Sequence, residues 1–120
     1  MEPVTIKVDT REQEPYKFDR MVVGTLHTGD YSIVGLEDEV AIERKTHQDA
    51  YGTIGQGRDR FERELERLGA MKYAAIVIES SVPEFLVPPH HSLLNPKSAI
   101  GSLLSWSVKH RLPVFFTGDR

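Results

Sequence analysis

The chain has 120 residues, a hydrophobic fraction of 39%, a charged fraction of 28% and a formal net charge of −3. This length fits one domain, which can bury roughly two thirds of its unfolded surface and needs no cross-links. The absence of cysteine excludes disulfides and thiolate chemistry and fits a reducing compartment. The negative net charge argues against a protein that coats nucleic acid through bulk electrostatics, but not against a nucleic-acid enzyme with an acidic metal site.

The sequence carries no signal for export or for membrane insertion. Its longest apolar run, residues 73–78, is far shorter than the about 20 residues that span a bilayer. The opening Met-Glu-Pro lacks the basic and apolar regions of a signal peptide. We therefore expect an intracellular protein of the cytoplasm, nucleoid or nucleus.

Short strands dominate the first half of the chain. Residues 4–9 alternate between apolar and polar side chains, which predicts a half-buried strand that ends at Asp9. A polar loop then leads to a second strand at 21–26. Residues 30–34 and 39–45 are expected to form the two arms of a β-hairpin.

Helical patterns begin after the hairpin. One or two helical turns over residues 46–51 are expected to lead into a flexible, glycine-rich loop at 52–57. A helix follows at 58–70, where apolar side chains recur every three to four residues, and Gly69 could cap its end.

The last third alternates strands and helices. The nearly continuous apolar run within 72–79 predicts a central strand covered on both faces. Capping signals predict a short helix at 81–86 and a longer one at 95–110, before a last strand at 114–116. The core of the long helix is expected to comprise Ile100, Leu103, Leu104 and Trp106. A hairpin-rich first half and a β-helix-β second half predict an α/β fold with a mixed β-sheet.

The hairpin brings charged side chains together. A turn near residue 37 places Asp30 opposite the far end of the second arm, where facing Cβ atoms lie about 5 Å apart. Because strand side chains alternate, Glu43 and Lys45 share one face while Arg44 points to the other. Two carboxylates and a lysine therefore converge on one patch.

Such a patch suits phosphodiester hydrolysis. A hard divalent cation such as Mg²⁺ or Mn²⁺ can neutralise the phosphate, activate water and stabilise the leaving oxygen. Asp30 and Glu43 are the candidate ligands, with the Arg44 carbonyl between them. Asp9, at the end of a neighbouring strand, could complete or extend the site. Lys45 could orient or deprotonate the attacking water, or stabilise the developing charge.

Other charged residues surround this patch. Asp49, at the start of the next helix, could help to position the site. Arg58, beside the glycine loop, could contact a DNA phosphate. Arg44 could twist to hold a carboxylate partner. Arg11 and Glu12 are either a surface ion pair of little energetic weight or part of the site.

A longer string is more specific than these charges alone. Gly29-Asp30, twelve residues, Glu43-Arg44-Lys45, three residues and Asp49 resembles the signature of the XPF-type (ERCC4 domain) structure-specific endonucleases, a branch of the PD-(D/E)XK nuclease superfamily. The resemblance extends to the family's Asp-x-Arg-Glu, Gly-Asp-Tyr and glycine-arginine motifs, and it runs from about residue 4 to residue 116. The matching segments are Asp9-Thr10-Arg11-Glu12, Gly29-Asp30-Tyr31, and Gly57-Arg58 followed by Phe61.

The resemblance implies a restriction-endonuclease-like mixed β-sheet core flanked by helices. It implies a Mg²⁺- or Mn²⁺-dependent DNA endonuclease that acts on branched, flap or repair-type DNA. In this reading Asp30 and Glu43 ligate the metal and Lys45 is catalytic. The supporting active-site residues are Asp9, Arg11, Glu12, Arg44 and Asp49.

The chain also departs from the family pattern. The segment between Glu12 and Met21 is shorter than in many relatives, and no tandem helix-hairpin-helix domain follows. Residues 1–120 would form a single nuclease domain that could lack the family's final helix. A homodimer or a pairing with a partner nuclease subunit would use the helix at 95–110 and the last strand.

Two other functions stay open at this point. One is a non-catalytic module of the same fold that binds DNA or a partner protein. The other is a PD-(D/E)XK nuclease that cuts ordinary duplex DNA.

Overall fold

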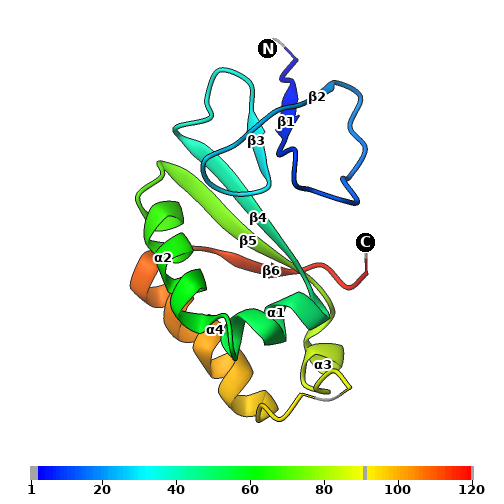
Figure 1. Ribbon diagram of the computed structural model, residues 1–120, viewed down its shortest axis with the longest axis vertical. Helices are drawn as coiled ribbons and strands as arrows, with labels where there is room; N and C mark the ends of the chain where they lie inside the picture. Colours follow the sequence, from blue (N-terminus) through cyan, green and yellow to red (C-terminus); the bar gives the residue numbers. More distant parts are fainter. Residues whose placement is uncertain (1–2, 91, 120) are drawn as a thin grey trace.

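The computed structural model describes residues 3–90 and 92–119. Six strands form one sheet in the order β2-β1-β3-β4-β5-β6 (Figure 1). Neighbours β1–β2, β4–β5 and β5–β6 are parallel, whereas β1–β3 and β3–β4 are antiparallel. The mixed sheet expected from the sequence is confirmed. Its strands are β1 (Ile6–Val8), β2 (Met21–Val23), β3 (Tyr31–Ile33), β4 (Val40–Thr46), β5 (Tyr73–Glu79) and β6 (Val114–Phe116).

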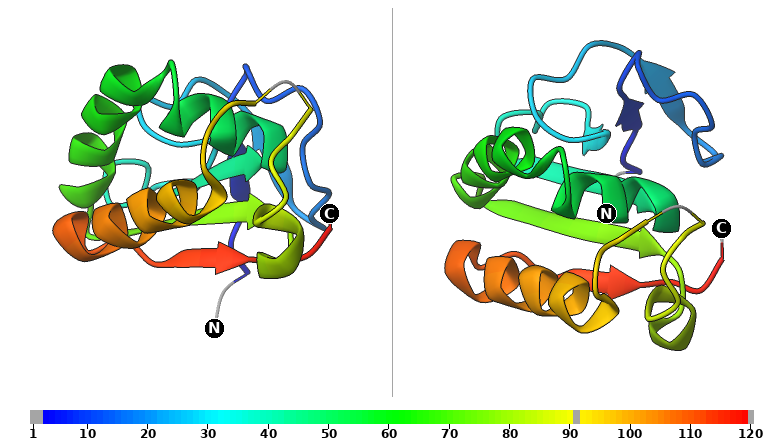
Figure 2. Two further views of the ribbon diagram at one scale, coloured as in Figure 1. Left: turned by 90° about the horizontal axis from the view of Figure 1, so that it is seen from below. Right: turned by 60° about the horizontal axis from the view of Figure 1, so that its bottom comes forward.

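Three long helices lie together on one side of the molecule, away from β1, β2 and β3 (Figure 1). Helix α1 packs against β4 and β5, α2 packs against β5 and α1, and α4 packs against both α1 and α2. In both views of Figure 2, β5 lies between α1 and β6. Within the described ranges, no helix is long and apolar enough to cross a membrane. The helices are α1 (His47–Ile54), α2 (Arg58–Gly69), α3 (Val82–Phe85) and α4 (Pro96–His110).

The hydrophobic core fills the space between the sheet and these helices. Phe61, Leu65 and Leu68 of α2 are buried because their spacing places them on one helical face. Two helix starts carry the expected caps, since Ser81 accepts from the Glu84 N–H and Asn95 accepts from the Lys97 N–H. The largest fully buried side chains are Val8, Leu65, Leu68, Ile76, Ile78 and Phe85.

The hairpin register determines where the ladder ends. Tyr31, the first residue of β3, pairs with Ile42 of β4. The Asp30 N–H still donates to the Ile42 carbonyl at 2.8 Å. Asp30 and Glu43 are therefore the next residues beyond the last pair of the antiparallel ladder. At this point the Asp30 side chain lies beside the edge of β4.

The glycine-rich segment is more helical than expected. Gly52, Thr53 and Ile54 belong to α1, and only residues 55–57 form the turn before α2. Ile54 is buried together with Ala50 and Tyr51. Burial of this apolar face offsets the cost of about 1 kcal/mol for a glycine inside a helix.

Two further expectations for the helices are wrong. Gly69 is the last residue of α2 and does not cap it; the capping residue is Ala70, in a right-handed conformation. Leu104 is exposed rather than buried. Leu103 and Trp106 face the core, and one residue turns a helix by about 100°, which carries Leu104 away from it.

Gly29 fixes the turn that presents Asp30. Its φ is +79°, and a Cβ there would lie 3.0 Å from the Ala41 Cβ and 3.1 Å from the Ile42 oxygen. Gly35 also has a positive φ, +92°, but open space around it. We predict that Gly35→Ala lowers the free energy of unfolding by about 1 kcal/mol, from backbone strain alone. Gly29→Ala adds a clash and should lower it by about 2–4 kcal/mol.

Urea denaturation followed by circular dichroism measures both losses on one scale. Equal losses for the two variants would show that close packing against β4 does not constrain Gly29.

Candidate active site

A cleft of about 720 Å³ opens beside the end of the hairpin ladder. Helices α1 and α2 form one wall, and the loops after β1 and β2 form the other. Of the predicted site residues, Glu12, Arg44 and Arg58 lie outside its lining. Those that line it are Asp9, Arg11, Asp30, Glu43, Lys45 and Asp49.

The floor of the cleft carries the two carboxylates and the lysine of the hairpin. The Arg44 backbone N–H donates to Asp30 Oδ2 at 2.8 Å, which fixes the Asp30 carboxylate against the edge of β4. Glu43 is buried. Lys45 Nζ lies 3.5 Å from Glu43 Oε2 and 4.9 Å from the centroid of the Phe61 ring. Glu43 and Lys45 thus share one face of β4, as strand alternation predicts.

The two carboxylates oppose each other's ionisation. Burial, followed by the nearby charge of Asp30, raises the pKa of Glu43 to about 8, and the opposing effect of Lys45 does not cancel this increase. Burial also raises the pKa of Asp30, although the hydrogen bond from the Arg44 N–H acts in the opposite direction. The raised pKa values show that Lys45 alone supplies too little positive charge to keep both carboxylates ionised.

Asp9 lies beside this pair, but protein groups occupy both of its oxygens. Oδ1 accepts the Leu26 N–H at 2.8 Å, and Oδ2 accepts Arg11 Nε at 2.7 Å. Burial disfavours the charged form of Asp9, but these hydrogen bonds outweigh burial and lower its pKa. Arg11 also donates to the Leu26 carbonyl at 3.0 Å. Asp9 and Arg11 therefore join the loop after β1 to the loop after β2.

The structure does not assemble three carboxylates around one point. Among the described residues, no group of three or more His, Cys, Asp or Glu side chains could hold a metal ion together. Asp30 and Glu43 lie together in the cleft, and Asp9 lies next to them with both of its oxygens hydrogen-bonded. That Asp9 completes or extends a metal site with them stays a prediction.

Arg44 organises the other face of β4. Its Nε and Nη2 donate to the two oxygens of Glu12 at 2.7 and 2.5 Å. Its Nη1 donates to Glu79 Oε1 at 2.8 Å. The Tyr16 hydroxyl donates to the other Glu79 oxygen at 2.6 Å, and the Arg44 guanidinium lies over the Tyr16 ring. All three charged side chains of this ion-pair network are at most 10% exposed.

Several sequence predictions are resolved by these contacts. Arg11 and Glu12 do not pair with each other, because Arg11 pairs with Asp9 and Glu12 pairs with Arg44. Asp49 lines the cleft from α1, and its N–H donates to Thr46 at the helix cap.

Arg58 points away from the cleft. It packs over the Trp106 ring, donates to Ser102 at 3.0 Å and pairs with Glu62. These contacts give Arg58 a role in joining α2 to α4. The expected contact with a DNA phosphate stays a prediction that this placement does not favour.

Sequence reasoning missed four residues. Glu79 is the second carboxylate partner of Arg44, and Arg60, Glu64 and Arg67 of α2 line the cleft. The position of Glu79 was a usable signal, because side chains at the carboxyl end of parallel strands gather at one edge of a sheet. The α2 residues carried no such signal, since their orientation depends on how the helix packs.

The comparisons with known proteins agree with this architecture. A family model of the ERCC4 domain matches residues 8–120. The solved structure of XPF from Aeropyrum pernix superimposes with a TM-score of 0.74 at 19% identity, covering 96% of this chain and 54% of that one. XPF from Aeropyrum pernix in complex with DNA matches with a TM-score of 0.74 at 18% identity, covering 98% and 57%. The chain thus spans about half the length of these structures. No curated protein matches it significantly.

The Arg44 network predicts a large effect on stability. Arg44→Met removes the guanidinium that the nearly buried Glu12 and Glu79 carboxylates share, which should lower the free energy of unfolding by about 3–5 kcal/mol. The triple variant Glu12→Gln/Arg44→Met/Glu79→Gln should recover much of this loss, because it also removes the two negative charges that Arg44 balances. Arg63→Met changes an exposed arginine and should stay within about 0.5 kcal/mol. Urea denaturation at pH 7 measures all three, and equal values for the single and triple variants would contradict the network.

The raised pKa of Glu43 predicts how stability depends on pH in the metal-free protein. The ordinary value of this carboxyl is 4.5 and the folded value is about 8. Between these values the folded protein retains a proton that the unfolded chain releases. The free energy of unfolding therefore falls as pH rises through this window, by about 1.4 kcal/mol for each unit of pKa difference.

Glu43→Gln provides the control for this effect. The difference in unfolding free energy between wild type and variant, measured by urea denaturation in EDTA, should change from pH 5 to pH 8 in favour of the variant. A difference that stays constant over this range would contradict the raised pKa.

Proposed function

Because the chain belongs to the ERCC4 domain family, we propose that it is a divalent-metal-dependent endonuclease that hydrolyses phosphodiester bonds in DNA. The observation that carries the proposal is the buried pair Asp30 and Glu43, with Lys45 beside it, at the floor of an open cleft. Two adjacent carboxylates are better suited to binding a hard cation than to acting as a general acid and base without a metal.

The donor set fits Mg²⁺ or Mn²⁺. Mg²⁺ is commonly held by one or two carboxylates together with water, and the raised pKa of Glu43 indicates an acidic centre that lacks positive charge. Asp30 and Glu43 would be the ligands. The N–H and C=O of one strand residue point to the same side, so the Arg44 carbonyl faces the same edge as the N–H that binds Asp30 and could supply a third oxygen. When bound, the cation would neutralise the phosphate and lower the pKa of a water.

The chain's own residues would perform the remaining tasks. Lys45, held by Glu43 and the Phe61 ring, would orient the attacking water through Nζ or donate a proton to a phosphate oxygen. The Arg44 N–H keeps the Asp30 carboxylate in place. Asp49 would position groups from the α1 wall, and the Asp9–Arg11 pair would hold the opposite wall.

DNA is the proposed substrate, in branched, flap or repair-type form. The complex of the Aeropyrum pernix XPF with DNA supports DNA as the polymer. An intracellular location is part of the same proposal, because cellular DNA would be the substrate. A dimer or a partner subunit is also proposed. Exposed apolar side chains on α4 and β6 support this, namely Leu104, Val108 and Phe115.

Cleavage assays test the proposed chemistry. Asp30→Asn, Glu43→Gln and Lys45→Met should each lower the cleavage rate by at least about 100-fold, because the first two each remove a charged ligand of the cation and the third removes the cation that acts on the water or the phosphate. The assay follows end-labelled flap, fork and linear duplex DNA with Mg²⁺, with Mn²⁺ and with EDTA. Glu62→Gln is the matched control, because Glu62 pairs with Arg58 away from the cleft, and it should retain activity.

The outcomes separate the alternatives. Wild-type protein that binds DNA and never cuts it would indicate a binding module instead. Equal cutting of duplex and flap DNA would indicate a duplex nuclease of the same superfamily. Full activity in the Asp30 and Lys45 variants would refute the proposed site.

A further inference from the structure

The charges of the cleft are arranged in two levels. Carboxylates occupy the floor, where Glu43 is buried. Exposed arginines stand at the rim: the side chains of Arg11 and Arg67 are 74% and 53% exposed, and Arg60 is exposed as well. This arrangement suits an anionic ligand. The exposed arginines would bind its negative charges, and the buried carboxylates would bind a metal ion at the reacting group.

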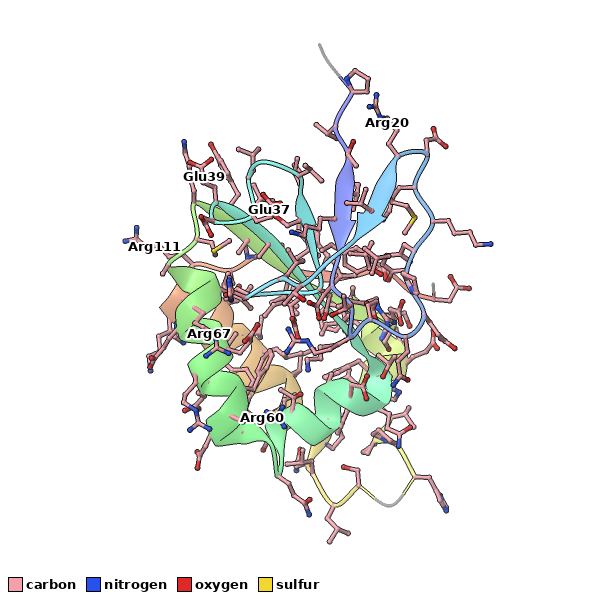
Figure 3. The ribbon with its side chains drawn as sticks, turned by 45° about the horizontal axis from the view of Figure 1, so that its top comes forward. Arg20, Glu37, Glu39, Arg60, Arg67 and Arg111 are labelled. Atoms are coloured by element: carbon pink, nitrogen blue, oxygen red, sulfur yellow. The ribbon has the colours of Figure 1, made fainter. Side chains whose placement is uncertain are left out.

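Arg60 and Arg67 stand on one face of α2. Figure 3 labels both on this helix, and both line the cleft. Seven residues complete nearly two turns, so the two side chains point the same way and start about 10.5 Å apart along the axis. This spacing lets the two guanidinium groups contact different phosphates of one DNA strand.

The charge of Arg60 has no opposite partner among the described residues. Over residues 3–90 and 92–119 it makes no hydrogen bond or ion pair, although Glu64 lies four residues further along the same helix, a spacing that favours pairing. Glu64 instead accepts the Gly29 N–H at 3.3 Å and pairs with Arg67. Arg60 therefore faces the cleft as an available cation.

Glu64 connects the arginine face to the floor. One of its oxygens binds the turn that precedes Asp30, and the other holds the Arg67 guanidinium. A guanidinium has five N–H donors, so Arg67 keeps donors for a further anion while Glu64 restricts its orientation. This pair also explains why an acidic residue lies between two arginines in the cleft.

We propose that Arg60 and Arg67 bind phosphates of one DNA strand and hold this strand along α2, with the phosphate to be cut over Asp30 and Glu43. This inference rests on the proposed function and extends it to the path of the substrate. The competing explanation is a solvated helix face whose charges do not touch DNA. Arg63 distinguishes the two, because it is exposed on the same helix and does not line the cleft.

Salt-dependent DNA binding tests the proposal. The probe is a fluorescein-labelled duplex with a single-stranded arm, and anisotropy is measured over a range of salt concentrations with Ca²⁺ in place of Mg²⁺. Arg60→Ala and Arg67→Ala should each weaken binding and reduce the slope of log K against log salt by about 0.7–0.9, the loss of one phosphate contact. Arg60→Lys should keep the wild-type slope, and Arg63→Ala should match wild type.

The result is separable from the cleavage test. Slopes for Arg60→Ala and Arg67→Ala equal to that of Arg63→Ala would overturn the strand path, even if the wild type cuts DNA. Reduced slopes in a protein that never cuts would support the strand path and refute the nuclease. Wild-type protein that does not bind the probe at any salt concentration would overturn both.

Discussion

The rest of the site depends on the ion pairs that the Arg44 guanidinium forms with Glu12 and Glu79. They join three separate parts of the chain, because Glu12 follows β1, Arg44 lies in β4 and Glu79 ends β5. A buried ion pair contributes little net stability but is costly to break, since a single deletion leaves charges without partners. The loop after β1 is therefore tied to the sheet. The Asp9–Arg11 pair lies in this loop and can form one wall of the cleft.

The same residue connects this support to the chemistry. The Arg44 side chain points to the supporting face of β4, while its backbone N–H binds the Asp30 carboxylate at the edge of the strand. Glu43 and Lys45, its neighbours in sequence, point to the cleft. One strand thus separates the ion-pair network of Arg44 on one face from the Asp30–Glu43 pair on the other, where the single charge of Lys45 does not balance two carboxylates. An unbalanced charge of this kind destabilises the fold locally and is expected where a site is arranged for binding or catalysis.

The sequence predicts which hairpin side chains lie together in the cleft, because their placement depends on local structure. Strand alternation places Glu43 and Lys45 on one face, and a short hairpin brings Asp30 next to them. Residues that depend on long-range packing were harder to place. Glu79 meets Arg44 only through the parallel register of β4 and β5, and no local pattern specifies that register.

Helix orientation explains the other differences. The sequence reveals that α2 has an apolar face, but which charged residues face the cleft depends on how the helix docks. Arg58 therefore packs on Trp106 while Arg60 lines the cleft. Gly52 lies inside α1 because the burial of Ile54 extends the helix past it. Asp9 shows the same limit for a carboxylate, since its hydrogen bonds to Leu26 and Arg11 could not be read from spacing.

A crystal structure of the protein grown with Mn²⁺ would test the central claim most directly. We expect one anomalous-scattering peak within about 2–2.5 Å of oxygens from both Asp30 and Glu43, with Asp9 still bonded to Arg11 and Leu26. A peak on Asp9 alone, or Asp30 and Glu43 carboxylates more than about 8 Å apart and too distant to share an ion, would contradict it.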